Sequence, residues 1–400
     1  MTSMTAAVVD VSSGKAAEVI AGVDTHSRTH HAAALDGQGR LLGSAQFTAD
    51  ATGYEQVLTW LRSFGTLHVV GVEGTSSCGA GLTRYLQQEH VSVLEVNRPD
   101  RRLRALRGKS DSLDAENAAR RALASTHTAT GSTTASTEPA RGRRNTTRTL
   151  PGEAVATPKD TTTVVEAVRA LRVARQGAVK ARTAALNQLK ALIITAPEQL
   201  RDELRQRPLK TAAAEAARYR PDAARLHEPL QATKWAMRCI GRRVEDLTTE
   251  IDGLNVHLTN LLTTTAPKTM ALFGVGTEHA GQLLVTAGGN PQRLSSESAF
   301  AALCGASPIP ASSGITNRHR LQRGGDRAAN SALYMIAVVR MRFCTQTRAY
   351  VERRTKEGLS KRDILRCLKR YIARQAYHAI MEDFSQLNVS SALQPAAMTT

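Results

Sequence analysis

Short apolar runs separated by turn residues occupy the N-terminal part of the chain. Residues 18–50 contain three of them, VIAGVD, THHAAALD and LLGSAQFT, and Gly37, Gln38 and Gly39 separate the last two. Apolar runs of this length, bounded by glycine, predict three β-strands with a tight turn between the second and the third. Apolar positions at helical spacing then predict a helix over residues 54–64.

Predicted strands and helices alternate after that helix. The segments LHVVGVEG and VSVLEV predict strands, and GLTRYLQQE, which lies between them, predicts a helix. A last helix is expected from about Ser112 to Leu123. This order of elements predicts an α/β domain with a mixed sheet over residues 18–125.

The composition changes between residues 126 and 163. This stretch is rich in Thr, Ser, Pro, Gly and Arg, and it has almost no large apolar side chains. Such a segment buries too little apolar surface to offset the entropy cost of ordering the chain. The sequence therefore predicts a disordered linker over residues 126–163.

Helical periodicity resumes near Val164 and continues, with breaks around Pro197 and Pro221, to residue 262. In its last part, apolar side chains recur at alternating intervals of four and three residues: Ile240, Val244, Leu247, Ile251, Leu254, Leu258 and Leu261. The pattern favours a coiled coil or a helical hairpin over residues 164–262, and the alternative is an ordinary amphipathic helix packed within one chain. We therefore expect a homo-oligomer, a dimer or a tetramer, that associates through this stretch.

The remaining residues, 263–385, are predicted to form a mainly α-helical domain with many loops. Within it, Phe273 to Gly276 read Phe-Gly-Val-Gly and precede a helix of small residues. This resembles a hairpin between two short helices that grips a DNA backbone through main-chain N–H groups. A glycine-rich turn that only reverses the chain is the alternative.

Charge changes this picture most. The 400 residues include 53 Lys and Arg against 35 Asp and Glu, a formal net charge of +18, which favours a polyanionic partner such as DNA. The basic residues also cluster near the C-terminus, where few acidic residues interleave and a phosphate-binding face is favoured over a merely solvated one. The candidate nucleic-acid-binding residues are Arg318, Arg320, Arg323, Arg327, Lys361, Arg362, Arg366, Lys369 and Arg370.

Other function classes find little support. The five cysteines are widely spaced and form no C-x-x-C pair, so neither a disulfide framework nor a zinc site is predicted. No apolar run reaches the roughly 18 residues of a membrane span, and the N-terminus lacks the pattern of a secretory signal. We expect a cytoplasmic protein without a membrane partner.

Four acidic residues occupy positions that suit metal binding. Asp24 ends the first predicted strand, Glu73 ends the fourth, and Asp111 and Asp114 begin the last helix of the domain. Taken singly, each reads as a solvated strand end or a helix cap. Together they are typical of nucleases of the ribonuclease H fold, in which carboxylates clamp two Mg²⁺ ions about 4 Å apart.

A second candidate site lies in the predicted C-terminal domain. Ser312 and Ser313 precede a glycine in a segment that also carries four arginines. An activated serine could attack a phosphate whose oxygens the arginines bind. The residues alone favour the alternative, a Ser-Ser-Gly turn beside a phosphate-binding arginine loop without chemistry.

Several motifs resemble the DEDD transposases of insertion sequences, a family that includes the bridge-RNA-guided recombinases. The N-terminal motifs are GVDTH, VEGT, VNRPDRR and GKSDSLDA, and the C-terminal ones are GASPIPASSG and RGGDRAANSALY. They stand in the family's order and cover roughly residues 20–125 and 265–385. The resemblance implies a ribonuclease H-like N-terminal domain and strand exchange between an insertion sequence and its target DNA.

The resemblance also implies roles for individual residues. Asp24, Glu73, Asp111 and Asp114 would bind Mg²⁺, and Ser313 would attack the scissile phosphate to form a covalent phosphoserine intermediate. The family's two domains dock to complete the site, often between protomers, and a structured guide RNA encoded by the element pairs with donor and target DNA.

Three features depart from the family pattern. Ser27 stands where many relatives carry a lysine, Ser312 is a second possible nucleophile, and the long linker is not expected. Two other functions fit parts of the sequence: a nucleic-acid-binding protein that does not cut, and a junction-resolving nuclease that uses water. The four acids argue against the first, and the serine segment argues against the second.

Overall fold

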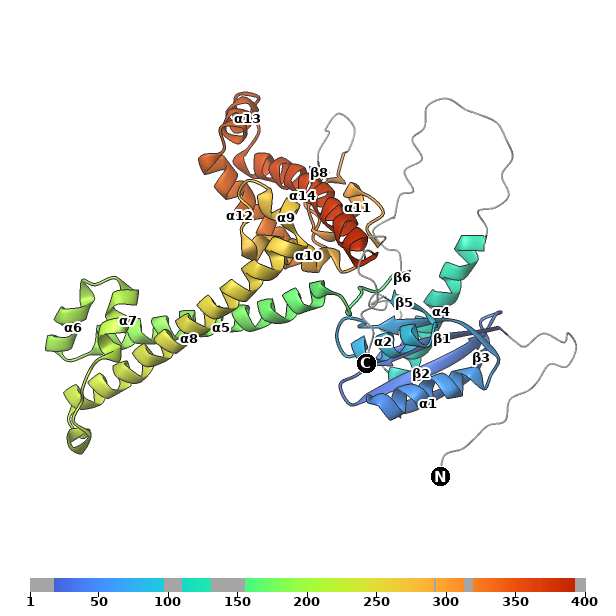
Figure 1. Cartoon of the computed structure of the whole chain (residues 1–400), viewed down its shortest axis with the longest axis horizontal. Helices are drawn as coiled ribbons and strands as arrows, with labels where there is room; N and C mark the ends of the chain where they lie inside the picture. The colour runs from blue at the N-terminus through green and yellow to red at the C-terminus, as the bar shows by residue number, and fades with distance from the viewer. Residues whose placement is uncertain (1–17, 97–109, 131–154, 291–292, 313–318, 393–400) are drawn as a thin grey trace, which may run out of the picture. The chain divides into compact units, whose positions relative to one another are not determined.

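The structure is a computed structural model that describes residues 18–96, 110–130, 155–290, 293–312 and 319–392 (Figure 1). The contacts divide the chain into two compact units. The N-terminal unit runs to Thr162 and also contains Gly288–Ser295. The helical unit contains Thr163–Ala287 and the chain from Ser296 onward.

The N-terminal unit is built on a mixed sheet of six strands in the order β3-β2-β1-β4-β5-β6. The strands are β1 (Glu18–Thr25), β2 (Thr29–Asp36), β3 (Leu41–Thr48), β4 (Thr66–Glu73), β5 (Ser92–Val96) and β6 (Val155–Ala156). The first three are antiparallel neighbours, whereas β4 is parallel to β1 and β5 is parallel to β4. With helices α1 (Ala51–Arg62), α2 (Ala80–Gln88) and α4 (Asp111–Thr130), this confirms the predicted mixed α/β domain.

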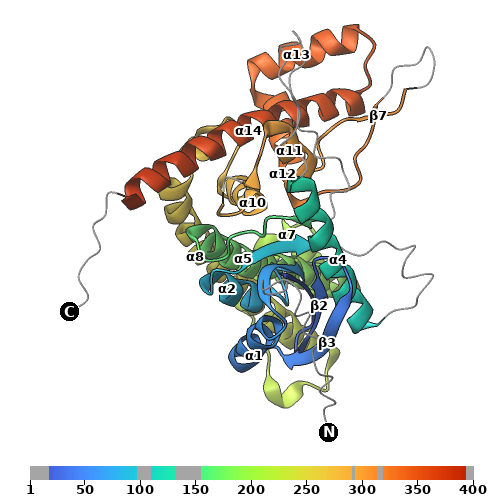
Figure 2. The ribbon, with the colours of Figure 1, turned by 90° about the vertical axis from the view of Figure 1, so that its right-hand side faces the viewer.

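Alternation along the strands assigns the two faces of this sheet. Val19, Ala21 and Val23 of β1 point to the core that α1 and α2 cover. Ile20 of β1 packs instead with Ala122 of α4. Figure 2 shows α4 on the side of the sheet opposite to α1. Because successive side chains of a strand point to opposite faces, every second residue from Ile20 onward lies on the α4 face.

Glycine on two central strands lets α4 approach the sheet closely. A Cβ atom built at Gly22 of β1 would lie 2.1 Å from the Ala119 nitrogen and 2.3 Å from the Ala115 carbonyl oxygen, both on α4. A Cβ atom at Gly71 of β4 would lie 2.7 Å from the Ala118 carbonyl oxygen. The backbone of α4 therefore rests directly on β1 and β4, and small residues are required on both sides of the contact.

We expect the substitution Gly22→Ala to lower the free energy of unfolding by about 3 kcal/mol or more, because an added methyl group must displace α4 backbone. Urea denaturation of the full chain measures this change. Gly177→Ala is the matched control, since Gly177 is an exposed residue of a helix and its added Cβ has nothing within 4 Å. Alanine there is expected to stabilise the protein slightly. Equal effects of the two substitutions would contradict the close α4 contact.

The prediction of a disordered linker over residues 126–163 is wrong at both ends of that range. Helix α4 continues to Thr130, and β6 pairs with β5 inside the supposed linker. Main-chain pairing requires no apolar side chains, and Arg293 and Asn290 donate hydrogen bonds to the carbonyl oxygens of Thr157 and Pro158. The composition of this stretch could not predict that residues 155–158 are ordered, because their hydrogen-bond partners lie far away in the sequence. Residues 131–154, the middle of the predicted linker, lie outside the described residues.

The helical unit contains a long helical hairpin. Helix α5 (Val164–Thr195) packs along α8 (Pro229–Thr265), and α6 (Glu198–Arg205) and α7 (Leu209–Ala217) lie at its far end (Figure 1). Along α8, Ile240, Val244, Ile251 and Leu258 of the predicted heptad positions are buried within the chain. The structure therefore shows the hairpin arrangement for this pattern, with α5 as its partner.

The remaining helices pack at the other end of α8. They are α9 (Pro267–Ala271), α10 (Thr277–Ala287), α11 (Glu297–Leu303), α12 (Arg327–Phe343), α13 (Thr345–Lys356) and α14 (Lys361–Ala392), and a two-stranded sheet joins β7 (Ile309–Pro310) to β8 (His319–Arg320). The Phe-Gly-Val-Gly turn connects α9 to α10, as the sequence predicts. The Phe273 carbonyl oxygen accepts a hydrogen bond of 2.8 Å from Arg340 Nε of α12.

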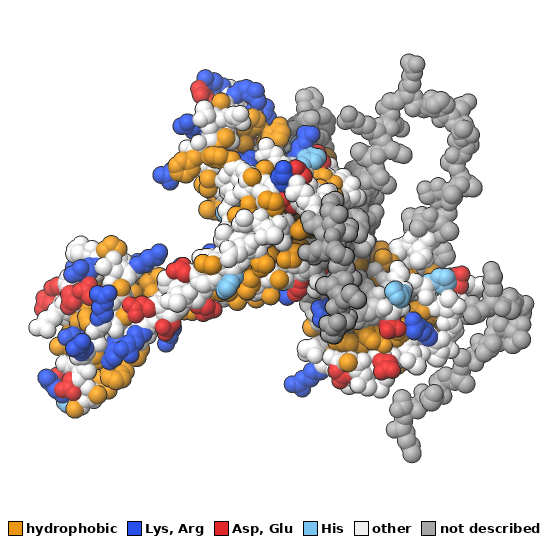
Figure 3. Space-filling view, viewed as in Figure 1, with side chains coloured by type: hydrophobic (Ala, Val, Ile, Leu, Met, Phe, Trp, Pro, Cys, Tyr) orange, Lys and Arg blue, Asp and Glu red, His pale blue; other side chains and the backbone are white. Residues whose placement is uncertain are grey.

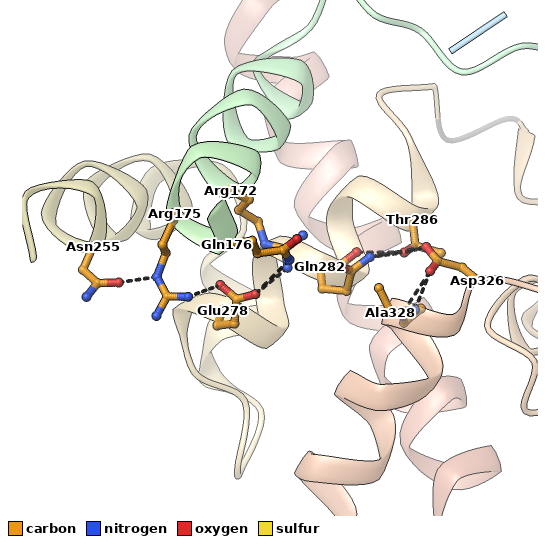
Figure 4. Close-up of polar contacts among 10 residues, drawn as sticks. Arg172, Arg175, Gln176, Asn255, Glu278, Gln282, Thr286, Asp326 and Ala328 are labelled. Carbon is orange, nitrogen blue, oxygen red and sulfur yellow. Dashed lines mark hydrogen bonds and ion pairs between the residues drawn. The ribbon is translucent and has the colours of Figure 1, made fainter. Parts of the chain in front are cut away.

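Charged and polar side chains join these helices to the hairpin (Figure 4). Arg172 and Arg175 of α5 pair with Glu278 of α10 at 2.6 and 2.9 Å. On α10, Thr286 donates to Asp326 at 2.7 Å, and the same carboxylate caps the N-terminus of α12. These contacts hold α10 against α5 and α12. Among the described helices, none is long and apolar enough to cross a membrane.

Candidate active sites of the two units

Two strand ends bring the first pair of predicted acids together. The parallel register aligns Val23 of β1 with Val72 of β4, so the residues that follow, Asp24 and Glu73, are neighbours at the same sheet edge. Alternation places both on the α4 face. Thr25 Oγ1 donates to the Glu73 carbonyl oxygen at 2.7 Å, which fixes the two strand ends side by side.

Helix α4 supplies the other two acids. It begins at Asp111, and Asp114 lies one turn further along and is only 3% exposed. The capping contact comes from Ser110, whose Oγ accepts from the Leu113 nitrogen at 3.3 Å. This contact makes Ser110 a capping residue of α4. The close approach of α4 at Gly22 brings its first turn toward the end of β1.

A histidine that the sequence did not single out lies between two of these acids. His26 Nε2 lies 3.3 Å from Asp24 Oδ2 and 3.4 Å from Asp111 Oδ1. One ligand atom from each of the three residues falls within 4.8 Å of the others, which is the spacing of a metal site. His26 follows Asp24 by two residues in the GVDTH motif, and side chains two apart share a side of an extended chain. This spacing is the feature of the sequence that could have indicated His26 as a candidate site residue.

Asp24, His26 and Asp111, with Glu73 and Asp114 beside them, are called the acidic cluster below. Its electrostatics favour a bound cation. Burial raises the pKa of Asp24, which is only 6% exposed, and the neighbouring carboxylates Asp114 and Asp111 raise it further, whereas His26 lowers it. A divalent cation would offset both the burial and the mutual repulsion. The donor set of carboxylates and one imidazole fits such an ion, and the buried His26 Nε2 has no hydrogen-bond partner among the described residues.

Glu73 and Asp114 stand slightly apart from this group. Neither belongs to the set of ligand atoms within 4.8 Å, which consists of Asp24, His26 and Asp111. Asp114 is nevertheless close enough to raise the pKa of Asp24, and Glu73 is the strand neighbour of Asp24. The structure thus gathers all four predicted acids at one edge of the sheet and brings two of them into ligand distance.

A basic cavity of about 930 Å³ forms the second candidate site, entirely within the helical unit. Helix α14, the C-terminal end of α13, strand β8 and the start of α11 line it. Its basic lining residues are Arg320, Arg354, Arg366, Lys369, Arg370 and Arg374, and its acidic ones are Glu297 and Asp363. Positive charge therefore predominates on its wall, and Lys and Arg also gather over α13 (Figure 3).

The structure divides the predicted nucleic-acid-binding residues into two groups. Those that line the cavity are Arg320, Arg366, Lys369 and Arg370. Those that are exposed elsewhere are Arg323, Arg327, Lys361 and Arg362, and Arg318 lies outside the described residues. Burial lowers the pKa of Lys369, and its Nζ donates to Asn330 Oδ1 at 2.9 Å. Arg354 and Arg374, which belong to the same basic C-terminal stretch of the sequence, also line the cavity.

The serine segment begins and ends at this cavity. Ser313 lies outside the described residues, and Ser312 is exposed. On either side of them, Ile309 pairs with Arg320 and Pro310 with His319 in the β7–β8 sheet. Since His319 and Arg320 line the cavity, the chain leaves and returns at its edge.

The RGGDRAAN motif has a structural role next to this cavity. Asn330 Nδ2 donates to the carbonyl oxygens of Cys304 and Gly305 at 3.0 and 2.9 Å, and Asp326 caps α12. Gly325 has a φ of 95°, and a Cβ atom there would lie 2.7 Å from the Gly305 nitrogen. These contacts fix the loop after α11 that leads into the serine segment.

Comparison with known families identifies the class of the protein. A family model for DEDD transposases of the IS110 type, described as a transposase, matches residues 21–141. A second model, described as transposase of the IS116/IS110/IS902 family, matches residues 267–352. The two matches contain the acidic cluster and the serine segment, so the chain is a transposase, a class of proteins that cut and rejoin DNA.

The chain belongs to the IS110-type family of insertion-sequence transposases. This confirms the family that the sequence motifs indicate. No curated protein matches the chain.

Proposed function

We propose that this protein cuts and rejoins DNA at the ends of an insertion sequence, with a divalent-metal site in its N-terminal unit and a serine nucleophile in its helical unit. The observation that carries the proposal is the convergence of Asp24, His26 and Asp111 within ligand distance at the edge of the sheet, beside Glu73 and Asp114. We further infer a ribonuclease H-like fold for the N-terminal unit. The strand order β3-β2-β1-β4-β5 with acids at two central strand ends, facing a helix, supports it.

Asp24, Glu73, Asp111 and Asp114 are the proposed metal-binding carboxylates, and Mg²⁺ is the expected ion. Hard oxygen ligands suit this ion. A divalent cation held by these residues would supply positive charge that stabilises the oxygens of a phosphoryl transfer. The protein holds these carboxylates in fixed positions. The strand register places Asp24 beside Glu73, and the contact of Gly22 with α4 sets the height of Asp111 and Asp114 above the sheet.

Ser313 is the proposed nucleophile. Its Oγ would form a bond to the scissile phosphorus while the bond from phosphorus to the 3′ oxygen breaks. The proton lost by Oγ is balanced by the proton that the leaving 3′ oxygen takes up, so the products are a 3′-hydroxyl and a 5′-phosphoserine. Attack on this linkage by another 3′-hydroxyl rejoins DNA without an outside energy source. The pairing of β7 with β8 supports the role, because it holds both ends of the serine segment at the basic cavity.

The arginines of the cavity are the proposed phosphate contacts. Arg366 pairs with Asp363 at 2.9 Å, and Arg370 and Arg374 both pair with Glu297. These ion pairs orient the guanidinium groups on the cavity wall. Arg320 reaches the same wall from β8. Bidentate contacts from such groups suit a phosphate backbone better than a neutral ligand.

The proposed partners extend beyond donor and target DNA. The family resemblance and the net charge of +18 support a structured guide RNA, which would bring a second phosphate backbone to the protein. A homo-oligomer is proposed as well, with the half-buried Leu247 and Leu254 of α8 as candidate contacts. We place the reaction in the cytoplasm of a cell that carries the element.

The proposal is tested by expressing the chain in cells together with the DNA that flanks its gene and sequencing new DNA junctions and co-purified RNA. New junctions at the element ends are expected, together with an RNA from the element's non-coding end. Nicks without rejoined junctions would instead support a junction-resolving nuclease that uses water. Bound nucleic acid without any break would support a binding protein.

A further inference from the structure

The acidic cluster contains one nitrogen donor among its oxygen donors. His26 Nε2 lies 3.3 Å from Asp24 Oδ2 and 3.4 Å from Asp111 Oδ1, so it faces both carboxylates rather than one. Beyond these two carboxylates the nitrogen has no hydrogen-bond partner among the described residues, and it is buried although 44% of the side chain is exposed. A buried polar atom without a hydrogen bond is unfavourable unless something else satisfies it.

The backbone holds His26 in this position. Its amide nitrogen donates to the Thr29 carbonyl oxygen at 3.0 Å and so closes the turn between β1 and β2. On the residues that flank the turn, Thr25 pairs with His30 in the antiparallel register. The imidazole is therefore presented to the carboxylates by a fixed turn, and Asp111 comes to it from the first turn of α4.

We propose that His26 Nε2 is a ligand of the divalent ion held by Asp24 and Asp111, and that it makes this site bind Mn²⁺ more tightly than Mg²⁺, the ion expected for the four carboxylates alone. The inference rests on the proposed function, because it concerns the same metal site. Mg²⁺ takes oxygen ligands almost exclusively, whereas ions later in the first transition row bind imidazole nitrogen increasingly well. Mn²⁺ accepts both carboxylate oxygen and imidazole, which matches this set of three donors.

An alternative role for His26 predicts the opposite effect of its removal on the affinity for the metal ion. If a protonated imidazole only pairs with Asp24 and Asp111, it competes with the metal ion for the carboxylates. Its removal would then strengthen metal binding. If it is a ligand, its removal weakens binding of Mn²⁺ more than binding of Mg²⁺.

The test measures Mn²⁺ binding to the nucleic-acid-free full chain by electron paramagnetic resonance, and Mg²⁺ binding by competition. In the wild type, we expect tighter binding of Mn²⁺ and a nitrogen coupling to the bound ion, which changes when the histidines are labelled with ¹⁵N. In His26→Asn, Mn²⁺ affinity should fall by about tenfold or more, Mg²⁺ affinity should fall less, and the nitrogen coupling should disappear.

Three control variants separate the possible failures. His68→Asn removes an exposed histidine that pairs with Glu18 and should change neither affinity. His31→Asn removes the histidine that pairs with Asp24 in the antiparallel register, and the coupling should persist in it, which excludes His31 as the source of the signal even if His26→Asn does not fold. Asp24→Asn should lose both ions, and retained binding there would overturn the proposed metal site itself. Unchanged or tighter Mn²⁺ binding in His26→Asn, or no nitrogen coupling in the wild type, would overturn the role of His26 alone.

Discussion

Replacing Asp24 with Ala is expected to reduce DNA strand cleavage by about a thousandfold while leaving DNA binding within a few-fold of the wild type. Asp24 is almost fully buried at the end of a central strand, within ligand distance of His26 and Asp111. Its loss removes a proposed metal ligand that the register of β1 and β4 holds at the end of a central strand. DNA binding should persist, because the proposed phosphate contacts belong to the helical unit. Cleavage is measured on labelled duplexes of the element ends, and binding by fluorescence anisotropy.

A carboxylate of the same helix provides the matched control for this prediction. Glu116 of α4 pairs with Arg120 at 2.6 Å and is not part of the acidic cluster. The substitution Glu116→Gln should therefore leave cleavage near the wild-type rate. Glu73→Ala should behave like Asp24→Ala. Recombination at wild-type levels in either of these two variants would refute the assignment of the metal-binding carboxylates.

The arrangement of the N-terminal acids could be predicted largely from the sequence, because strand periodicity determines it. Once β1 and β4 are neighbouring parallel strands, Asp24 and Glu73 must share a face and an edge. The height of α4 above that face was not predictable in the same way. This height depends on the contact of Gly22 with the alanines of α4. Because glycine within a strand also occurs at bulges and tight bends, its presence in the sequence does not predict a close helix contact.

Features that depend on contacts between distant segments were missed. The contact between His26 and Asp111 forms because α4 brings Asp111 to the end of β1, and β6 is ordered by β5 and by Arg293 and Asn290. The heptad pattern of α8 could not reveal whether its partner is another chain or α5. The basic cavity is built from four separate segments, so its residues could be selected only as a general basic surface.

Replacing Ser313 with Ala is expected to eliminate a covalent protein–DNA adduct, while Ser312→Ala should retain it. The β7–β8 pairing joins the two described ends of the segment that contains both serines, next to a cavity whose wall carries Arg320 and Arg366. Arginines there can neutralise the charge that develops on the phosphate during attack. The glycine after Ser313 gives the backbone room to approach DNA closely. The glycine and the family pattern favour the second serine of the pair.

The measurement traps the reaction on a nicked suicide substrate, whose released strand diffuses away so that rejoining fails and the adduct accumulates. Mass spectrometry of the digested adduct then locates the modified serine. Because the two serines are adjacent, Ser312→Ala controls for disturbance of the segment as a whole. An adduct on Ser312, or an adduct that persists in Ser313→Ala, would show that the nucleophile is the neighbouring residue. Accumulation of free 5′-phosphate ends without any adduct would show that water attacks, and the serine segment would then serve DNA binding rather than bond exchange.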